Sequence, residues 1–223
     1  MAHREVRLQA RADIGRERAL EVVGDDLDEL AAGDLLVVVS VFSREGDPAD
    51  VAAAEALGLA GVVHLAVDPA SRRGYDDAHA AHDGLRAGDD APMVAAAVLA
   101  IALGRLEPGL VLAPLGLTGH VDHLVVERAL DELALPRLRW LDLPYALRRT
   151  PGGPLGAGEL VAVPAGDAHL AAKLTAAAVY PGAEPQRLAD HAVAEGERLG
   201  AGGPVELLVR RDLDNDVDGP AVG

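Results

Sequence analysis

Three continuous runs of apolar residues limit the folds open to this chain more than any other feature. They cover residues 35–42, 61–67 and 109–113, and valine is frequent in all but the last, shortest run. A run that is apolar at nearly every position predicts a strand buried on both faces, as in parallel sheets covered by helices. A shorter run at 138–141 predicts a fourth strand.

Segments rich in alanine and leucine lie between these runs and have the length of helices. The expected helices span 17–32, 48–57, 92–106 and 120–133. The second and third begin with a proline, which is favoured in the first turn of a helix. Strands that alternate with helices in this way predict the α/β class, and we expect a Rossmann-like three-layer sandwich with a mostly parallel sheet.

The chain has 223 residues, enough for one well-buried α/β domain. We expect a single domain with its core over about residues 10–181, a C-terminal extension over 182–211 and a frayed tail over 212–223. Further elements are expected after the Pro/Gly break at 151–154: strands at 159–163 and 205–211, and helices at 167–180 and 185–199.

The composition excludes several functions. The formal net charge of −16 repels phosphate backbones and anionic membrane surfaces, so nucleic acid is not an expected partner. Because the chain has no cysteine, a transition-metal site must use His, Asp or Glu. No apolar stretch reaches the ~20 residues of a membrane span, and no apolar signal segment follows Met1, so we expect a cytoplasmic protein.

A histidine pair stands where the third predicted strand gives way to a helix. His120 and His123 flank Asp122 and follow Gly119. The carboxyl end of a parallel strand is where α/β folds bind ligands, and a His-x-x-His spacing can direct two imidazoles into one pocket. The alternative is that the histidines are polar helix-entry residues and that Asp122 is a first-turn carboxylate favoured by the helix dipole.

The histidine pair and its surroundings resemble the G-H-x-D-H segment of the PIG-L/LmbE-like N-deacetylases. Other segments resemble that family in the same order along the chain: 39–43, 71–75, 142–145 and 173–180. The resemblance covers about residues 35–181. It implies a zinc-dependent hydrolase that removes an acetyl group from an N-acetylated sugar or a glycosylated small molecule.

The resemblance also implies a role for individual residues. His123 is expected to bind zinc, His120 to stabilise the charged tetrahedral intermediate, and Asp122 to orient the loop or a neighbouring imidazole. Substrate contacts are expected from the polar loop 68–90 and from the stretch after the fourth strand, at Arg72, Arg73, Tyr75 and Tyr145. His79 and His82, in the same polar loop, could also reach the pocket.

The first half of the family's metal site is not recognisable. Its A-H-P-D-D-E-type turn should fall near 13–17, where Ile14 holds the histidine place and only Asp13 and Glu17 offer oxygen. His3 and the acidic pair at 25–26 are better explained as solvated charge. A rearranged metal site, a scrambled N-terminus and an inactive member that binds a sugar-like ligand or a partner without hydrolysis all remain open.

The principal rival enzyme classes lack their motifs. No glycine-rich phosphate loop follows a predicted strand, which disfavours a nucleotide-binding domain, and no G-x-S-x-G elbow is present for a serine hydrolase. The sequence makes no prediction about oligomeric state. A small-molecule substrate is the expected partner.

Overall fold

The computed structural model describes residues 36–42, 48–77, 79–143, 145–148, 158–180 and 182–210. Its strands are β1 (Val37–Ser40), β2 (Gly61–His64), β3 (Val111–Pro114), β4 (Arg137–Trp140), β5 (Glu159–Pro164) and β6 (Val205–Arg210). Its α-helices are α3 (Pro48–Ala56), α4 (Ala91–Leu106), α5 (Val121–Glu132), α6 (Asp167–Ala178) and α7 (Pro185–Leu199). Three 3-10 helices complete the set: η1 (Ala70–Arg72), η2 (Ala80–His82) and η3 (Tyr145–Arg148).

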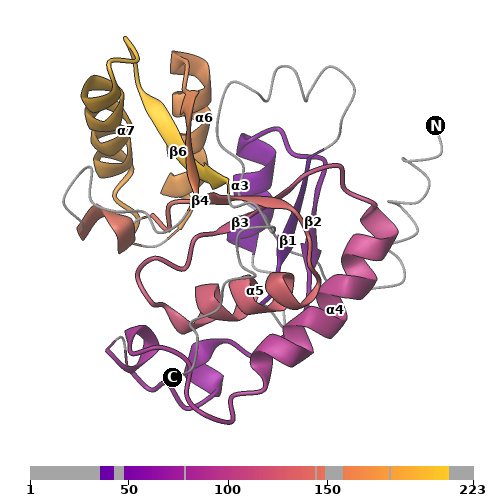
Figure 1. The fold of residues 1–223 in the computed structure, drawn as a ribbon. Coiled ribbons are helices and arrows are strands. Elements are labelled where there is room, and N and C mark those ends of the chain that lie inside the picture. Colours follow the sequence, from indigo (N-terminus) through magenta and orange to yellow (C-terminus); the bar gives the residue numbers. More distant parts are fainter. Residues whose placement is uncertain are drawn as a thin grey trace.

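These elements form two sheets with helices around them (Figure 1). β1 pairs with β2 in parallel, and β3 pairs with β4 in parallel, each pair being joined through a helix. β6 then pairs antiparallel with both β4 and β5. The α/β Rossmann-like class is therefore confirmed, with parallel pairing in the first four strands and antiparallel pairing in the last two.

The predicted strands and helices correspond to observed elements wherever the structure describes the chain. The expected strands at 61–67 and 109–113 are shorter or shifted, as β2 ends at His64 and β3 runs to Pro114. The polar stretch 68–90 contains η1 and η2. The helix expected at 17–32, the donors expected near 13–17 and the tail at 212–223 lie outside the described residues.

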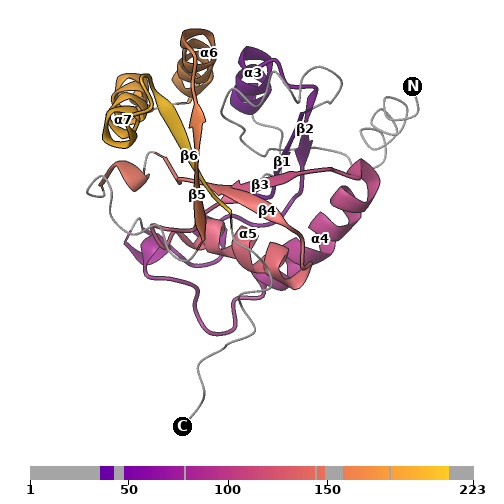
Figure 2. The same ribbon diagram turned by 45° about the horizontal axis from the view of Figure 1, so that its top comes forward.

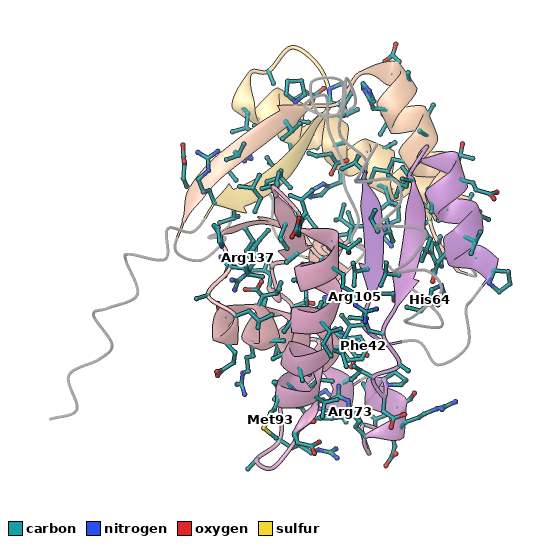
Figure 3. All side chains as sticks on the ribbon, turned by 90° about the vertical axis from the view of Figure 1, so that its right-hand side faces the viewer. Phe42, His64, Arg73, Met93, Arg105 and Arg137 are labelled. Carbon is teal, nitrogen blue, oxygen red and sulfur yellow. The ribbon has the colours of Figure 1, made fainter. Side chains whose placement is uncertain are left out.

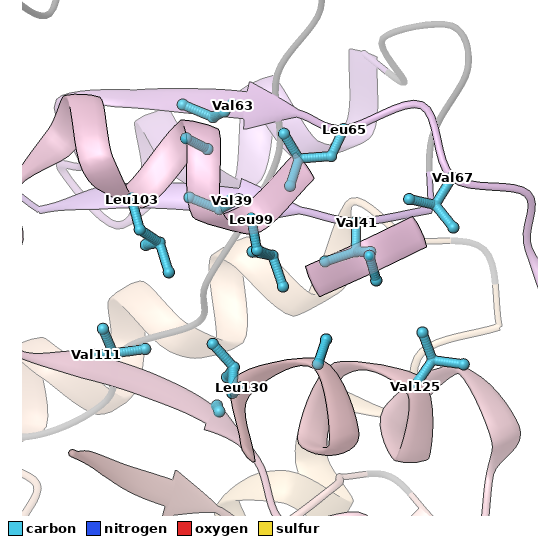
Figure 4. Packing of buried hydrophobic residues seen from close by; sticks show 14 of the residues in the cluster. Val39, Val41, Val63, Leu65, Val67, Leu99, Leu103, Val111, Val125 and Leu130 are labelled. Atoms are coloured by element: carbon cyan, nitrogen blue, oxygen red, sulfur yellow. The ribbon is translucent and has the colours of Figure 1, made fainter. Parts of the chain in front are cut away.

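The main core lies where α4 and α5 pack against β1, β2 and β3 (Figure 4). Alanines at 95, 102 and 129 are fully buried, which lets the helix backbones approach closely while Leu99 and Leu130 fill the remaining space. Full burial of a leucine contributes on the order of 2–3 kcal/mol. This packing fixes the axis of α5, and with it the histidines at its first turn.

The helices divide between two sides of the molecule. In Figures 1 and 2, α4 and α5 lie on one side, and α6 and α7 lie beside β6 on the other. α7 is strongly amphipathic, with Leu188, Ala189 and Ala192 buried toward the body of the protein. No helix within the described ranges is long and apolar enough to cross a membrane.

A cavity of about 200 Å³ is lined by residues from both sheets and from α4 and α5. Residues 39–42 border it from β1, Val111 and Pro114 from β3, and Leu99 and Leu103 from α4. Among the described residues, no strand pairs with the second edge of β1 or of β3. We call this region the β1–β3 seam, and His123 also borders it.

Candidate functional site

The histidine motif lies on a tight turn between β3 and α5. Gly119 has φ +74°, in the left-handed region that favours glycine, and an added Cβ there would lie 3.0 Å from the carbonyl oxygen of His82. The turn therefore packs directly against the backbone of η2, which only glycine permits at this place. The predicted strand-to-helix position of the motif is confirmed, because β3 ends at Pro114 and α5 begins at Val121.

Three imidazole rings gather at this turn. The ring centroids of His120 and His123 are 5.2 Å apart, and the ring of His82 lies edge-on to His120 at 5.0 Å. His82 Nδ1 lies 3.0 Å from the carbonyl oxygen of Thr118, a hydrogen bond that ties η2 to the turn. His79, in contrast, has a side chain that is 90% exposed and lies 3.8 Å from Asp83.

His120 caps the N-terminus of α5 and is held in its neutral form. Its Nδ1 accepts a hydrogen bond of 3.3 Å from the Asp122 amide. Burial, followed by the neighbouring His123 ring, lowers the pKa of His120, and Asp122 opposes this shift in part. A neutral ring that accepts at Nδ1 carries its proton on Nε2, so His120 can offer a hydrogen bond from that atom.

His123 has a buried carboxylate behind it. Its Nδ1 lies 3.5 Å from Asp142 Oδ1, an ion-pair distance outside hydrogen-bond geometry. The Asp142 side chain is fully buried and accepts a hydrogen bond of 2.8 Å from the Leu117 amide. Asp142 follows β4, so the carboxyl ends of two neighbouring parallel strands supply this pair. A carboxylate facing Nδ1 is the arrangement that orients Nε2 of a metal-binding histidine.

The Asp122 carboxylate faces the loop 68–90. It accepts hydrogen bonds from the Ala70 amide, at 3.0 and 3.2 Å, and from Arg73 Nη2 at 2.5 Å. Arg73 also pairs with Asp89, and its side chain is only 10% exposed. The guanidinium carbon lies 5.8 Å from the ring centroid of Phe42 at the end of β1. Arg73 thus joins three segments of the chain (Figure 3).

Tyr75 is buried within the same network. Its hydroxyl donates to Asp89 Oδ2 at 2.8 Å and accepts from the Arg86 amide at 3.0 Å. Burial raises the pKa of Tyr75, with Asp89 adding to the shift. Burial also raises the pKa of Asp89, but hydrogen bonds from Tyr75, the Ala91 amide and Arg73 outweigh it and hold that pKa below its usual value.

The substrate-side candidates therefore differ in their surroundings. Arg72 is exposed at the end of η1, whereas Arg73 and Tyr75 are buried and bonded within the protein. Tyr145 is the first residue of η3, and its side chain lies outside what the structure describes. His82 had no distinguishing sequence signal beyond its place in a polar loop, and Asp142 stood out only as part of the family-like stretch 142–145.

The described part of the chain does not assemble a full metal site. Within it, no group of three or more His, Asp or Glu side chains is arranged to hold a metal ion. The donor chemistry nevertheless fits one zinc ligand at His123, backed by Asp142. The remaining sequence candidates, Asp13 and Glu17, lie outside the described residues.

Solved structures with a similar fold include a deacetylase of the A40926 pseudoaglycone and deacetylases of the teicoplanin biosynthesis pathway. The A40926 pseudoaglycone deacetylase Dbv21 matches with a TM-score of 0.59 and 19% identity, covering 81% of this chain and 86% of its own. A deacetylase–teicoplanin complex matches with a TM-score of 0.61 and 19% identity, covering 83% and 92%. The zinc-inhibited form of teicoplanin deacetylase Orf2 matches with a TM-score of 0.54 and 20% identity, covering 93% of each chain.

Sequence comparison adds no closer relative. No protein-family model matches the chain, and no curated protein matches it. The similarity to the solved deacetylases spans most of both chains at low identity. This chain therefore shares the Rossmann-like fold of these deacetylases.

Proposed function

We propose that this protein is a zinc-dependent N-deacetylase of the PIG-L/LmbE type, which hydrolyses the amide of an N-acetylated sugar or of a glycosylated small molecule. One observation carries the proposal: His120, Asp122 and His123 occupy the β3–α5 turn, with buried Asp142 behind His123. The fold shared with solved deacetylases supports it.

His123 is the proposed metal ligand in this site. Its ring is 26% exposed and borders the β1–β3 seam, while Asp142 faces its Nδ1. Zinc, when bound, would activate a water molecule and polarise the amide carbonyl. The other donors have to come from outside the described residues, where Asp13 and Glu17 are the candidates.

His120 is the proposed stabiliser of the tetrahedral intermediate. Because its Nδ1 accepts from the Asp122 amide, its Nε2 carries the proton that can bond to the developing oxyanion. Burial lowers the pKa of His120, which favours the neutral ring as this donor. A neutral donor in a partly buried site is still an effective oxyanion contact.

The proposed substrate is a neutral or cationic N-acyl amino sugar, free or attached to a small molecule. The formal charge of −16 disfavours polyanionic substrates. Arg72, which is exposed, and Tyr145 are proposed to contact the substrate directly. One structural neighbour was solved as a complex with teicoplanin, and we propose teicoplanin as a test ligand for this site.

A second candidate is a family member that binds a sugar-like ligand or a partner without hydrolysis. The sequence near 13–17, where the family's A-H-P-D-D-E-type turn is not recognisable, favours it. One structural neighbour was solved in a zinc-inhibited form, so zinc binding alone is not evidence of deacetylase activity. The two candidates differ in one measurable respect, the release of a free amine.

The deciding experiment is incubation with an N-acetylglucosamine glycoside, with zinc, manganese or chelator, followed by mass spectrometry of the deacetylated amine. The proposal predicts metal-dependent product from the wild type and none from His123→Ala. The matched control is His79→Ala, which removes a surface histidine and should match the wild type. Binding without product under every metal condition would favour the non-hydrolytic candidate.

A further inference from the structure

The loop 68–90 is fastened to the first turn of α5 by one buried guanidinium. Arg73 pairs through Nη2 with Asp122 at 2.5 Å and through Nη1 with Asp89. The side chains of these partners are 16% and 7% exposed, so the three charges lie together away from solvent. Buried charges of this kind hold a defined geometry only when each has its counter-charge.

Asp122 transmits this contact to the histidines. It lies between His120 and His123 on the same helical turn, and its amide donates to His120 Nδ1. Its carboxylate accepts hydrogen bonds from the Ala70 amide and from Arg73, so two separate groups hold its side chain. A shift of Asp122 would therefore move the His120 ring, which accepts from its amide, and the helical turn that bears His123.

The contacts of Arg73 with other protein groups leave little of its guanidinium surface accessible to a ligand. Phe42 and Tyr75 both lie near the guanidinium carbon, at 5.8 and 5.3 Å from their ring centroids. Two carboxylates approached by different nitrogens need the planar fork of arginine, because a lysine ammonium is a single point charge. Figure 3 places Arg73 beside Phe42, at the end of β1.

We propose that Arg73 is a positioning residue that sets the histidine pair by locking Asp122, and that it does not bind the substrate. The inference rests on the proposed function, since it assigns Arg73 a part in the same site. It replaces the substrate-contact role that the sequence resemblance implied for this residue. Exposed Arg72, its neighbour, keeps that role.

The kinetic test compares Arg73→Lys, Asp122→Asn and the double variant in the deacetylation assay. A positioning role predicts that Arg73→Lys lowers kcat about 10- to 100-fold, the scale typical of residues that orient a metal ligand, with KM within about twofold. The double variant should be no worse than the poorer single variant, because both changes break one connection. Two results together would overturn the proposal. Arg73→Lys would raise KM and leave kcat unchanged, and the effect of the double variant would equal the product of the two single effects.

Amide hydrogen exchange tests the same link without any activity. Arg73→Lys should speed exchange at the Ala70 amide and over the first turn of α5, whereas the surface change Arg187→Lys should not. If Arg73→Lys does not fold, Tyr75→Phe weakens the same network more gently, through Asp89. Unchanged exchange at Ala70 in the folded variant would overturn the positioning role. An inactive wild type with faster exchange in the variant would instead reject only the proposed function.

Discussion

The two sides of the candidate site are built very differently. On the α5 side, the carboxylates of Asp89, Asp122 and Asp142 all accept hydrogen bonds from the chain. On the β1–β3 seam, valines and leucines border a cavity of about 200 Å³. Within the described residues, the strands on its two sides each pair with only one neighbour. Hydrogen bonds from the chain thus hold the carboxylates on the half of the site that carries the histidine motif, whereas the described residues on the other half complete no metal-binding group.

The largest expected effect compares a core valine on α5 with a core valine that borders the cavity. Val125 on α5 is fully buried away from the seam, whereas Val39 on β1 borders the cavity. Val125→Ala should lower the free energy of unfolding by about 2–3 kcal/mol, because it removes two methyl groups and leaves a void. Val39→Ala should cost less, because part of the Val39 side chain borders the cavity and not packed atoms of the described residues.

Substitution of the same two valines by the larger isoleucine tests the same comparison between Val125 and Val39. Val125→Ile should cost about 1–3 kcal/mol through overpacking, whereas Val39→Ile should be neutral or stabilising by up to about 1 kcal/mol. Denaturant unfolding of the four variants gives the comparison directly. Equal costs at both positions would mean that the seam is packed as tightly as α5.

The second expected effect concerns the buried carboxylate behind His123. Asp142→Asn keeps the shape of the side chain and an oxygen acceptor for the Leu117 amide, but removes the charge 3.5 Å from His123 Nδ1. Zinc affinity should fall about 10- to 100-fold, as for other outer partners of metal-binding histidines. Competition with a chromophoric chelator measures it, and the exposed α7 change Asp190→Asn is the matched control. Unaltered affinity would remove Asp142 from the site.

The smallest expected effect is a pH dependence on the α5 side. Tyr75→Phe should cost about 1 kcal/mol at neutral pH, because Asp89 and the Arg86 amide lose a buried partner. Hydrogen bonds hold the pKa of Asp89 below its usual value against the effect of burial, so its stabilisation is present above the unfolded pKa and is lost as pH falls through the folded pKa.

Tyr75 is the largest of the contributions that lower the pKa of Asp89. Its removal raises that pKa, so the variant should lose less stability on acidification than the wild type does. Unfolding measured at neutral pH and near pH 3, below the usual carboxylate range, checks this. A gap between the two proteins that widens in acid would show that Tyr75 does not stabilise the charged form of Asp89.

Local patterns predicted much of this molecule, and long-range contacts account for what they missed. Helix α5 follows from the spacing of Val121, Val125 and Ala129, and the position of the histidine turn follows from the strand before it. The pairing of Arg73 with Asp122 joins residues 49 positions apart, which no periodicity records. The contact of His82 with Thr118 is of the same kind, at 36 positions.

Strand direction was equally hidden in the sequence. The run at 205–211 predicted a strand. An apolar run, however, does not indicate whether the strand is parallel or antiparallel to its neighbours, or which strands those neighbours are. β6 lies antiparallel between β4 and β5, which gives the C-terminal part a different pairing from the first four strands. Among the described residues β1 and β3 belong to different sheets, which was not predicted either, because each is locally an ordinary buried strand.

Zinc content per chain, measured by elemental analysis on the wild type and on His123→Ala, tests the central claim most directly. The account predicts close to one zinc per wild-type chain, with donors beyond the described residues completing the site, and loss of that zinc in the variant. Equal zinc in both proteins, or none in either, would contradict a metal site at the β3–α5 turn.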